Sequence, residues 1–153
     1  MKLFEVLDKH VEWEWEHNEA EGGVALFKIG EYYYRVIFEH DHNYYDHAMD
    51  DMEHPPEFFT GIMILIRHED DNQWTSTATN TGNEFQVFAT VSAIMQEFIK
   101  QHKPEAISFS AHADEPTRVR LYKRFVRKLA TIGYHEKFSD RDGVALVWVL
   151  VKE

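Results

Sequence analysis

Histidine and aspartate crowd the segment between residues 40 and 57, and both residue types bind divalent metal ions. The set comprises His40, Asp41, His42, Asp46, His47, Asp50, Asp51 and His54. Alternation along an extended chain puts His40 and His42 on the same side, where they could chelate one ion. The spacing matches no metal-binding motif, so we expect a solvated acidic loop and no metal cofactor.

A second set of polar residues, Thr81, Gly82, Asn83 and Glu84, opens a long amphipathic segment. Backbone N–H groups at the start of a helix attract anions such as phosphate. The pattern Thr81-x-x-Glu84 also fits a capping box, in which the threonine hydroxyl and the glutamate carboxylate satisfy the first amides of the helix. A phosphate site and a self-capped helix are therefore both open, and they compete for the same amide groups.

Strands are predicted in the first half of the chain, where apolar and polar residues alternate or β-branched residues gather. The predicted strands are His10–His17, Val24–Ile29, Tyr32–Glu39, Phe59–Arg67 and Trp74–Thr79. Gly30 and Glu31 are predicted to form the tight turn of a hairpin.

Helices enter in the second half. Apolar residues recur at helical spacing from Glu84 to His102, and Pro104 is expected to end this helix. A second helix is predicted from an Asp114 N-cap to Gly133. Strands are predicted at Ala106–Ala111, Tyr134–Phe138 and Val144–Val151, with a turn at Asp140–Gly143. The last strand is apolar on both faces, which is typical of the middle of a covered sheet.

This order of elements predicts a mixed-sheet α/β (α+β) fold of about six to seven strands with two main helices. Residues 1–153 are expected to form a single domain. Within it, residues 1–72 would form an acidic strand meander and residues 73–153 a βαβαββ core.

Charge is unevenly distributed along the chain, whose formal net charge is −11. Residues 1–71 carry 18 acidic and 5 basic side chains, whereas residues 72–153 carry 9 acidic and 11 basic. An acidic surface repels nucleic acid and membranes, so we expect no direct contact with either. It could bind a basic protein partner or serve only to keep the protein in solution.

Compartment is indicated by what the sequence lacks. The chain has no cysteine, no apolar stretch of the ~18 residues that a membrane span needs, and no apolar core of a signal peptide near Met1. A cytoplasmic location is therefore expected.

The second predicted helix is strongly basic. Its cations are Arg118, Arg120, Lys123, Arg124, Arg127 and Lys128. A solvated amphipathic helix explains them, since cations also suit the C-terminal end of the helix dipole. Two functional alternatives are an anion contact and a dock for the acidic half of a second copy in a homodimer.

The succession of elements from Trp74 to Glu153 resembles the GNAT (acyl-CoA N-acyltransferase) core. A strand leads through Thr79–Glu84 into a long helix, and a strand and a helix carrying Leu121-Tyr122 follow. The segments TGNEFQVFATVSAIMQEFI, ISFSA and TRVRLYKRF are also similar to short uncharacterised proteins of tailed bacteriophages. This resemblance implies a GNAT-like single domain, acetyl-CoA as cofactor and, for a phage-encoded protein, the host cell cytoplasm.

In this family the turn before the long helix holds the coenzyme A pyrophosphate, which implies Thr81, Gly82, Asn83 and Glu84 as the cofactor-binding residues. Gly82 falls on the first glycine of the family motif. Two positions depart from it, because Thr79 stands where the family has glutamine or arginine and Glu84 stands where it has a second glycine or alanine. A carboxylate about 4 Å from a bound phosphate charge would oppose it by about 4 kcal/mol at an effective dielectric of about 20.

The resemblance also implies Tyr122 as the catalytic acid that protonates the departing thiolate. Glu115 and Arg118 replace the asparagine and alanine of that motif, and Gly133 arrives two helical turns late. Tyr122 lies on the apolar stripe of the helix as well, so a packed core tyrosine is an equal alternative.

Two functions follow. One is an acetyl-CoA-dependent N-acetyltransferase with a degenerate cofactor site, although Glu16–Gly23 is too short for the two helices that usually grip the acceptor. The other is a non-catalytic acidic binding protein on the same fold, such as a host-factor inhibitor or a nucleic-acid mimic.

Overall fold

The computed structural model describes residues 10–40, 59–75, 83–112, 116–142 and 145–152. Contacts divide the chain into two compact units, each assembled from two segments. Unit 1 comprises Met1–Ile37 and Met63–His102, and unit 2 comprises Phe38–Ile62 and Lys103–Glu153.

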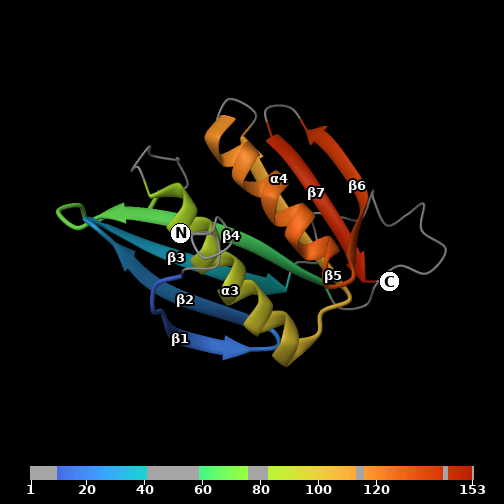
Figure 1. The fold of residues 1–153 in the computed structure, drawn as a ribbon, viewed down its shortest axis with the longest axis horizontal. Helices are drawn as coiled ribbons and strands as arrows, with labels where there is room; N and C mark the ends of the chain where they lie inside the picture. Colours follow the sequence, from blue (N-terminus) through green and yellow to red (C-terminus); the bar gives the residue numbers. More distant parts are fainter. Residues whose placement is uncertain (1–9, 41–58, 76–82, 113–115, 143–144, 153) are drawn as a thin grey trace, which may run out of the picture. The chain divides into compact units, whose positions relative to one another are not determined.

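The described residues form a mixed α/β fold with one seven-stranded sheet and two helices (Figure 1). The elements are β1 (Glu14–Glu19), β2 (Gly22–Ile29), β3 (Tyr32–His40), β4 (Phe59–His68), α3 (Glu84–His102), β5 (Ala106–His112), α4 (Pro116–Ala130), β6 (Tyr134–Asp142) and β7 (Ala145–Lys152). The strand order is β1-β2-β3-β4-β5-β7-β6. The predicted fold class is confirmed.

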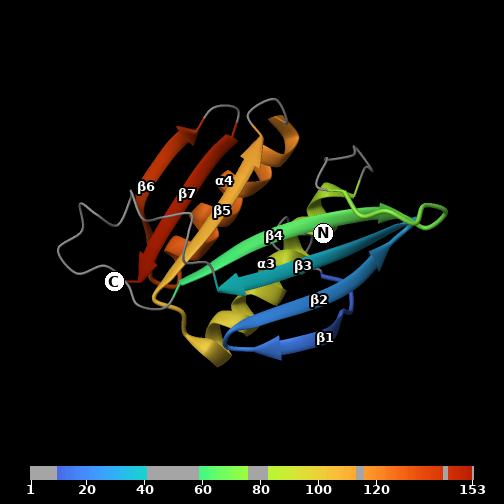
Figure 2. The ribbon, with the colours of Figure 1, turned by 180° about the vertical axis from the view of Figure 1, so that it is seen from behind.

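In unit 1, helix α3 covers one face of the antiparallel strands, and the opposite face is turned toward the viewer in Figure 2. Alternation in β2 selects the covered face, where Ala25, Phe27 and Ile29 are buried. Gly23 belongs to this series, and a Cβ there would lie 3.2 Å from the Phe98 ring of α3. A side chain at Gly23 would therefore push the helix away from the strand.

Helix α3 has the limits that its apolar periodicity predicts, Glu84–His102. Val91, Ile94, Met95 and Phe98 line its buried face and are at most 1% exposed. Lys103 follows the helix with a φ of 48°, the left-handed conformation common just after a helix end, and Pro104 then prevents continuation.

In unit 2, β5 pairs with two strands. The first four residues of β4, Phe59–Ile62, pair in parallel with Ala106–Phe109. On its other side β5 pairs antiparallel with β7 over its whole length, and β7 pairs antiparallel with β6. The last strand of the chain thus lies between β5 and β6, as its apolar character predicts.

Three predicted elements differ from the structure. Strand β6 runs to Asp142, so the turn expected at Asp140–Gly143 is wrong: pairing with β7 continues to Asp142↔Ala145 and overrides the low strand propensity of aspartate. Strand β1 begins at Glu14 rather than His10. Of the strand expected at Trp74–Thr79, the described part forms a single bridge between Thr75 and Ile66.

Candidate functional site

The start of α3 carries the described half of the predicted cofactor site. Thr81 and Gly82 lie outside the described residues, whereas Asn83 and Glu84 are placed and half-buried. The helix begins at Glu84, and the Val87 N–H donates to the Asn83 carbonyl at 2.9 Å. Asn83 is therefore the N-cap residue, a position that asparagine favours.

The position of the N-cap at Asn83 contradicts the predicted capping box. A capping box needs its glutamate three residues after the N-cap, but Glu84 directly follows the N-cap and is the first residue of the helix. Asparagine and threonine are both good N-caps, and the helix begins two residues later than it would with Thr81 as the N-cap. The box is therefore wrong, and the carboxylate of Glu84 instead sits in the first turn, where it favours the helix dipole.

The β2–β3 turn lies beside this helix start. Gly30 adopts a φ of 60°, which a residue with a side chain rarely tolerates. A Cβ at Gly30 would lie 3.7 Å from the Asn83 side-chain nitrogen, so the N-cap side chain packs against the hairpin. The predicted tight turn at Gly30-Glu31 is confirmed.

Tyr122 lies within the packed layer between α4 and β5 and is 1% exposed. Its ring centroid is 5.5 Å from that of Phe109 and 6.1 Å from that of Phe125. The position matches the packed alternative for this tyrosine. Tyr122 belongs to unit 2 and the start of α3 to unit 1, so the structure does not join the predicted catalytic and cofactor-binding residues in one unit.

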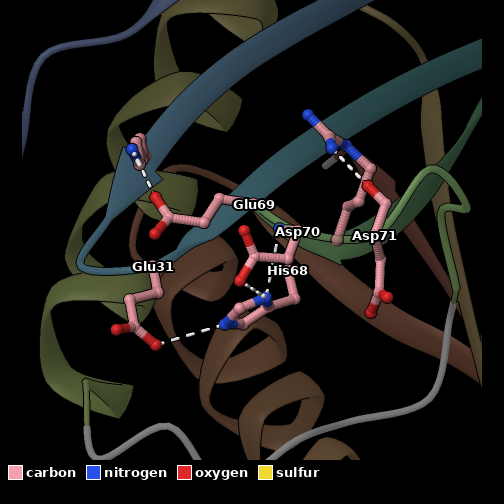
Figure 3. Close-up of polar contacts among 7 residues, drawn as sticks. Glu31, His68, Glu69, Asp70 and Asp71 are labelled. Atoms are coloured by element: carbon pink, nitrogen blue, oxygen red, sulfur yellow. Dashed lines mark hydrogen bonds and ion pairs between the residues drawn. The ribbon is translucent and has the colours of Figure 1, made fainter.

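A polar cluster that sequence reasoning missed lies at the end of β4 (Figure 3). We call it the His68 cluster; its residues are Glu31, His68, Glu69, Asp70 and Asp71. The His68 Nε2 lies 3.1 Å from a Glu31 carboxylate oxygen, and the Asp70 N–H donates to the His68 Nδ1 at 3.2 Å. A backbone bond from the Glu69 N–H to the Glu31 carbonyl, 2.8 Å long, fixes the two turns together.

The charges of the His68 cluster shift two pKa values. The hydrogen bond that His68 donates to the Glu31 carboxylate raises the pKa of His68 above 6.5, and the charges of Asp70 and Asp71 raise it further. The hydrogen bond with Glu69, 3.0 Å long, raises the pKa of Lys28. Both groups therefore hold their protons more firmly than they would in water. No sequence signal links positions 31 and 68, because strand pairing alone brings them together.

Metal binding finds no support in the part of the chain that the structure places. It contains no group of three or more histidine, cysteine, aspartate or glutamate side chains able to hold an ion. Of the predicted acidic loop, His40 ends β3 and residues 41–58 lie outside the described residues. No helix among the described residues is long and apolar enough to cross a membrane.

The two charged surfaces expected from the sequence are partly described. Glu12, Glu14 and Glu16 are exposed at the β1 edge of unit 1, whereas Asp46, Asp50 and Asp51 lie outside the described residues. On α4, Arg120, Lys123 and Arg127 are exposed, and Arg124 and Lys128 are half-buried.

Comparison with protein-family models matches none of them to this chain, and comparison with curated proteins likewise finds no match.

Proposed function

We propose that the chain is a GNAT-like, acyl-CoA-binding protein of the N-acyltransferase type with acetyl-CoA as its ligand. The observation that carries this proposal is the order of elements. Strand β4 precedes α3, with residues 69–83 between them, β5 returns parallel to β4, and β7 lies between β5 and β6. The resemblance implies this order and the central place of the last strand, except that it expects the strand before the helix at Trp74–Thr79, of which the described part forms a single bridge.

The coenzyme pyrophosphate would bind at the first turn of α3. The first amides of any helix lack an intrahelical acceptor and carry partial positive charge. Here they belong to Glu84, Phe85 and Gln86, directly after the Asn83 N-cap. The Glu84 carboxylate repels a bound diphosphate and must turn away from it. This chain should therefore bind the coenzyme more weakly than a protein that has glycine at this position.

Acyl transfer itself requires an amine to attack the thioester carbonyl, the C–S bond to break, and the thiolate to take up a proton. The resemblance implies that Tyr122 donates this proton to the thiolate. A substrate can reach this 1%-exposed side chain only after the α4–β5 packing opens. The turn Ala20-Glu21 joins β1 directly to β2, so the acceptor has no helices there to grip it. The proposal therefore rests on coenzyme binding.

Calorimetric titration with acetyl-CoA tests it, using wild type, Glu84→Gln and the control Glu21→Gln, which removes an exposed carboxylate at the β1–β2 turn. We expect binding by wild type, tighter binding by Glu84→Gln, and no change in the control. A Kd of about 10 μM would stabilise the fold by about 2.7 kcal/mol at about 1 mM ligand. No heat and no shift in Tm in any of the three proteins would refute the proposal.

A non-catalytic acidic binder is the second candidate, and the exposed row Glu12, Glu14 and Glu16 favours it. Salt-sensitive binding of an oligolysine peptide, lost when these three charges are reversed, would support this function if acetyl-CoA fails to bind.

A further inference from the structure

The sheet face of unit 1 that α3 leaves uncovered carries residue types that are enriched in protein interfaces. Since Tyr34, Val36, Ile64 and Ile66 are buried with the helix-side series, the alternate residues of β3 and β4 point to the other face. They are Tyr33, Arg35, Met63, Leu65 and Arg67, joined by Lys28 of β2 and by Trp74. Aromatic residues, methionine and arginine are the types that interfaces select.

Cations and rings alternate across this face in a continuous ladder. The Lys28 ammonium lies 4.9 Å from the Tyr33 ring centroid, and the Arg67 guanidinium lies 4.7 Å from the same centroid. Arg67 also lies 5.3 Å from the Trp74 centroid, and Arg35 lies 4.5 Å from it. Each ring therefore already has two cations over it, which orders the side chains before any partner binds and leaves the rings poorly suited to stack on nucleic-acid bases.

Carboxylates lie along the margins of the same face. Glu14 pairs in register with Leu26, on the face away from α3, and Glu16 lies 3.7 Å from Arg35. At the other end Glu69 lies 3.0 Å from Lys28. Glu19 pairs with Gly22 on the same face, so four carboxylates, three of them on β1, stand against three cations on β2 to β4. Because the β1 carboxylates and the β2–β4 cations lie on different strands, a second copy turned to face the first can set opposite charges against each other, although the net charge of the chain is −11.

We propose that this ladder face binds a second copy of the chain in a two-fold symmetric dimer. Strands β1 to β4 are consecutive in the sheet. A two-fold axis that runs along the strands between β2 and β3 therefore lays β1 of one copy over β4 of the other. Glu14 is level with Leu26, and Arg67 is level with Lys28 through their shared contact with Tyr33. Glu14 of one copy and Arg67 of the other then lie on facing strands, two positions apart along them, within reach of the long arginine side chain, and Met63, 45% exposed, lies in the contact. An isologous contact of this kind repeats each pair twice.

The size of the face sets the expected strength. Four strands about 4.8 Å apart and eight residues long at about 3.3 Å per residue cover about 500 Å². Stable interfaces bury about 800 Å² per partner, so the dimer should be weak and reversible. We expect dissociation in the micromolar range.

Sedimentation velocity from 1 to about 300 μM protein measures this directly. Wild type should shift from monomer to dimer, Arg67→Glu should stay monomeric, and the double variant Glu14→Arg/Arg67→Glu should dimerise again because the charges are exchanged. The control Lys100→Glu makes the same charge change at an exposed position of α3, and this variant should dimerise as wild type does. A wild type that stays monomeric, or a dimer that Arg67→Glu leaves intact, overturns the proposal.

Cysteine cross-linking locates the contact, because the chain has no cysteine of its own. In this geometry the two copies of position 63 lie about 14 Å apart across the strands, on sheets about 10 Å apart, which is too far for a disulfide. A bis-maleimide reagent that spans this distance should therefore cross-link Met63→Cys into a dimer. Phe85→Cys, at an equally exposed residue of α3 (48%), should not. Equal cross-linking at both positions, or at neither, contradicts a contact through the ladder face.

Discussion

Replacing Tyr134 by phenylalanine should destabilise the protein through the loss of one buried hydrogen bond. The Tyr134 hydroxyl donates to the Pro104 carbonyl at 2.6 Å, and Tyr134 is fully buried. The bond ties the start of β6 to the segment that follows α3. Phenylalanine keeps the ring and its packing but leaves the buried carbonyl without this donor, which costs about 1 to 2 kcal/mol. At about 2 to 4 °C per kcal/mol, Tm should fall by several degrees.

The pH dependence gives this prediction a second test. Burial raises the pKa of Tyr134 to about 12, above its ordinary value of 10.0. The unfolded chain therefore loses this proton first, and the stabilising contribution is complete below pH 10 and declines as the pH rises toward 12. Urea unfolding at pH 7 and pH 11 should show that the difference between wild type and Tyr134→Phe is smaller at the higher pH.

A matched control is Tyr32→Phe, which removes a hydroxyl from a half-buried ring and should change stability little. The reasoning is refuted if Tyr134→Phe is as stable as Tyr32→Phe at pH 7. It is also refuted if the cost of Tyr134→Phe stays constant between pH 7 and pH 11.

Two further substitutions test the packing of α4 and the His68 cluster. Tyr122→Ala removes a buried ring from between Phe109 and Phe125 and should cost about 3 to 5 kcal/mol in urea unfolding, whereas a cost below about 1.5 kcal/mol would contradict the packed position. Glu31→Gln should lower the pKa of His68 toward 6.5 in an NMR titration, because Glu31 is the main cause of its raised value. Because the pKa of His68 is higher in the folded protein, its protonation stabilises the fold below pH 6.5, and this stabilisation is lost as the pH rises through the pKa of the folded state. Glu31→Gln should therefore lower the free energy of unfolding more at pH 5.5 than at pH 8.5.

The sequence predicts well those elements whose signal is local. Helix α3 follows from its apolar spacing and from Pro104, and the β2–β3 hairpin follows from Gly30. The central position of strand β7 in the sheet is also predicted, because a strand that is apolar on both faces must be covered on both faces.

Features that depend on pairing between distant strands cannot be predicted from a local sequence pattern. The His68 cluster joins positions 31 and 68, and the ladder joins Tyr33 to Arg67 and Trp74. Neither set has a local pattern, since strand order and register alone bring the residues together. The first turn of α3 was ambiguous for a different reason: Thr81 and Asn83 are both good N-caps, and only the structure selects Asn83.

The central claim is that the amides that open α3 receive the pyrophosphate of an acyl-CoA. An NMR titration of ¹⁵N-labelled protein with acetyl-CoA, followed at the backbone amides, tests it most directly. The proposal predicts saturable shifts at Glu84, Phe85 and Gln86, with the amide of Lys100 near the other end of the helix unmoved. Amides of Glu84 to Gln86 that do not move at millimolar acetyl-CoA would contradict it.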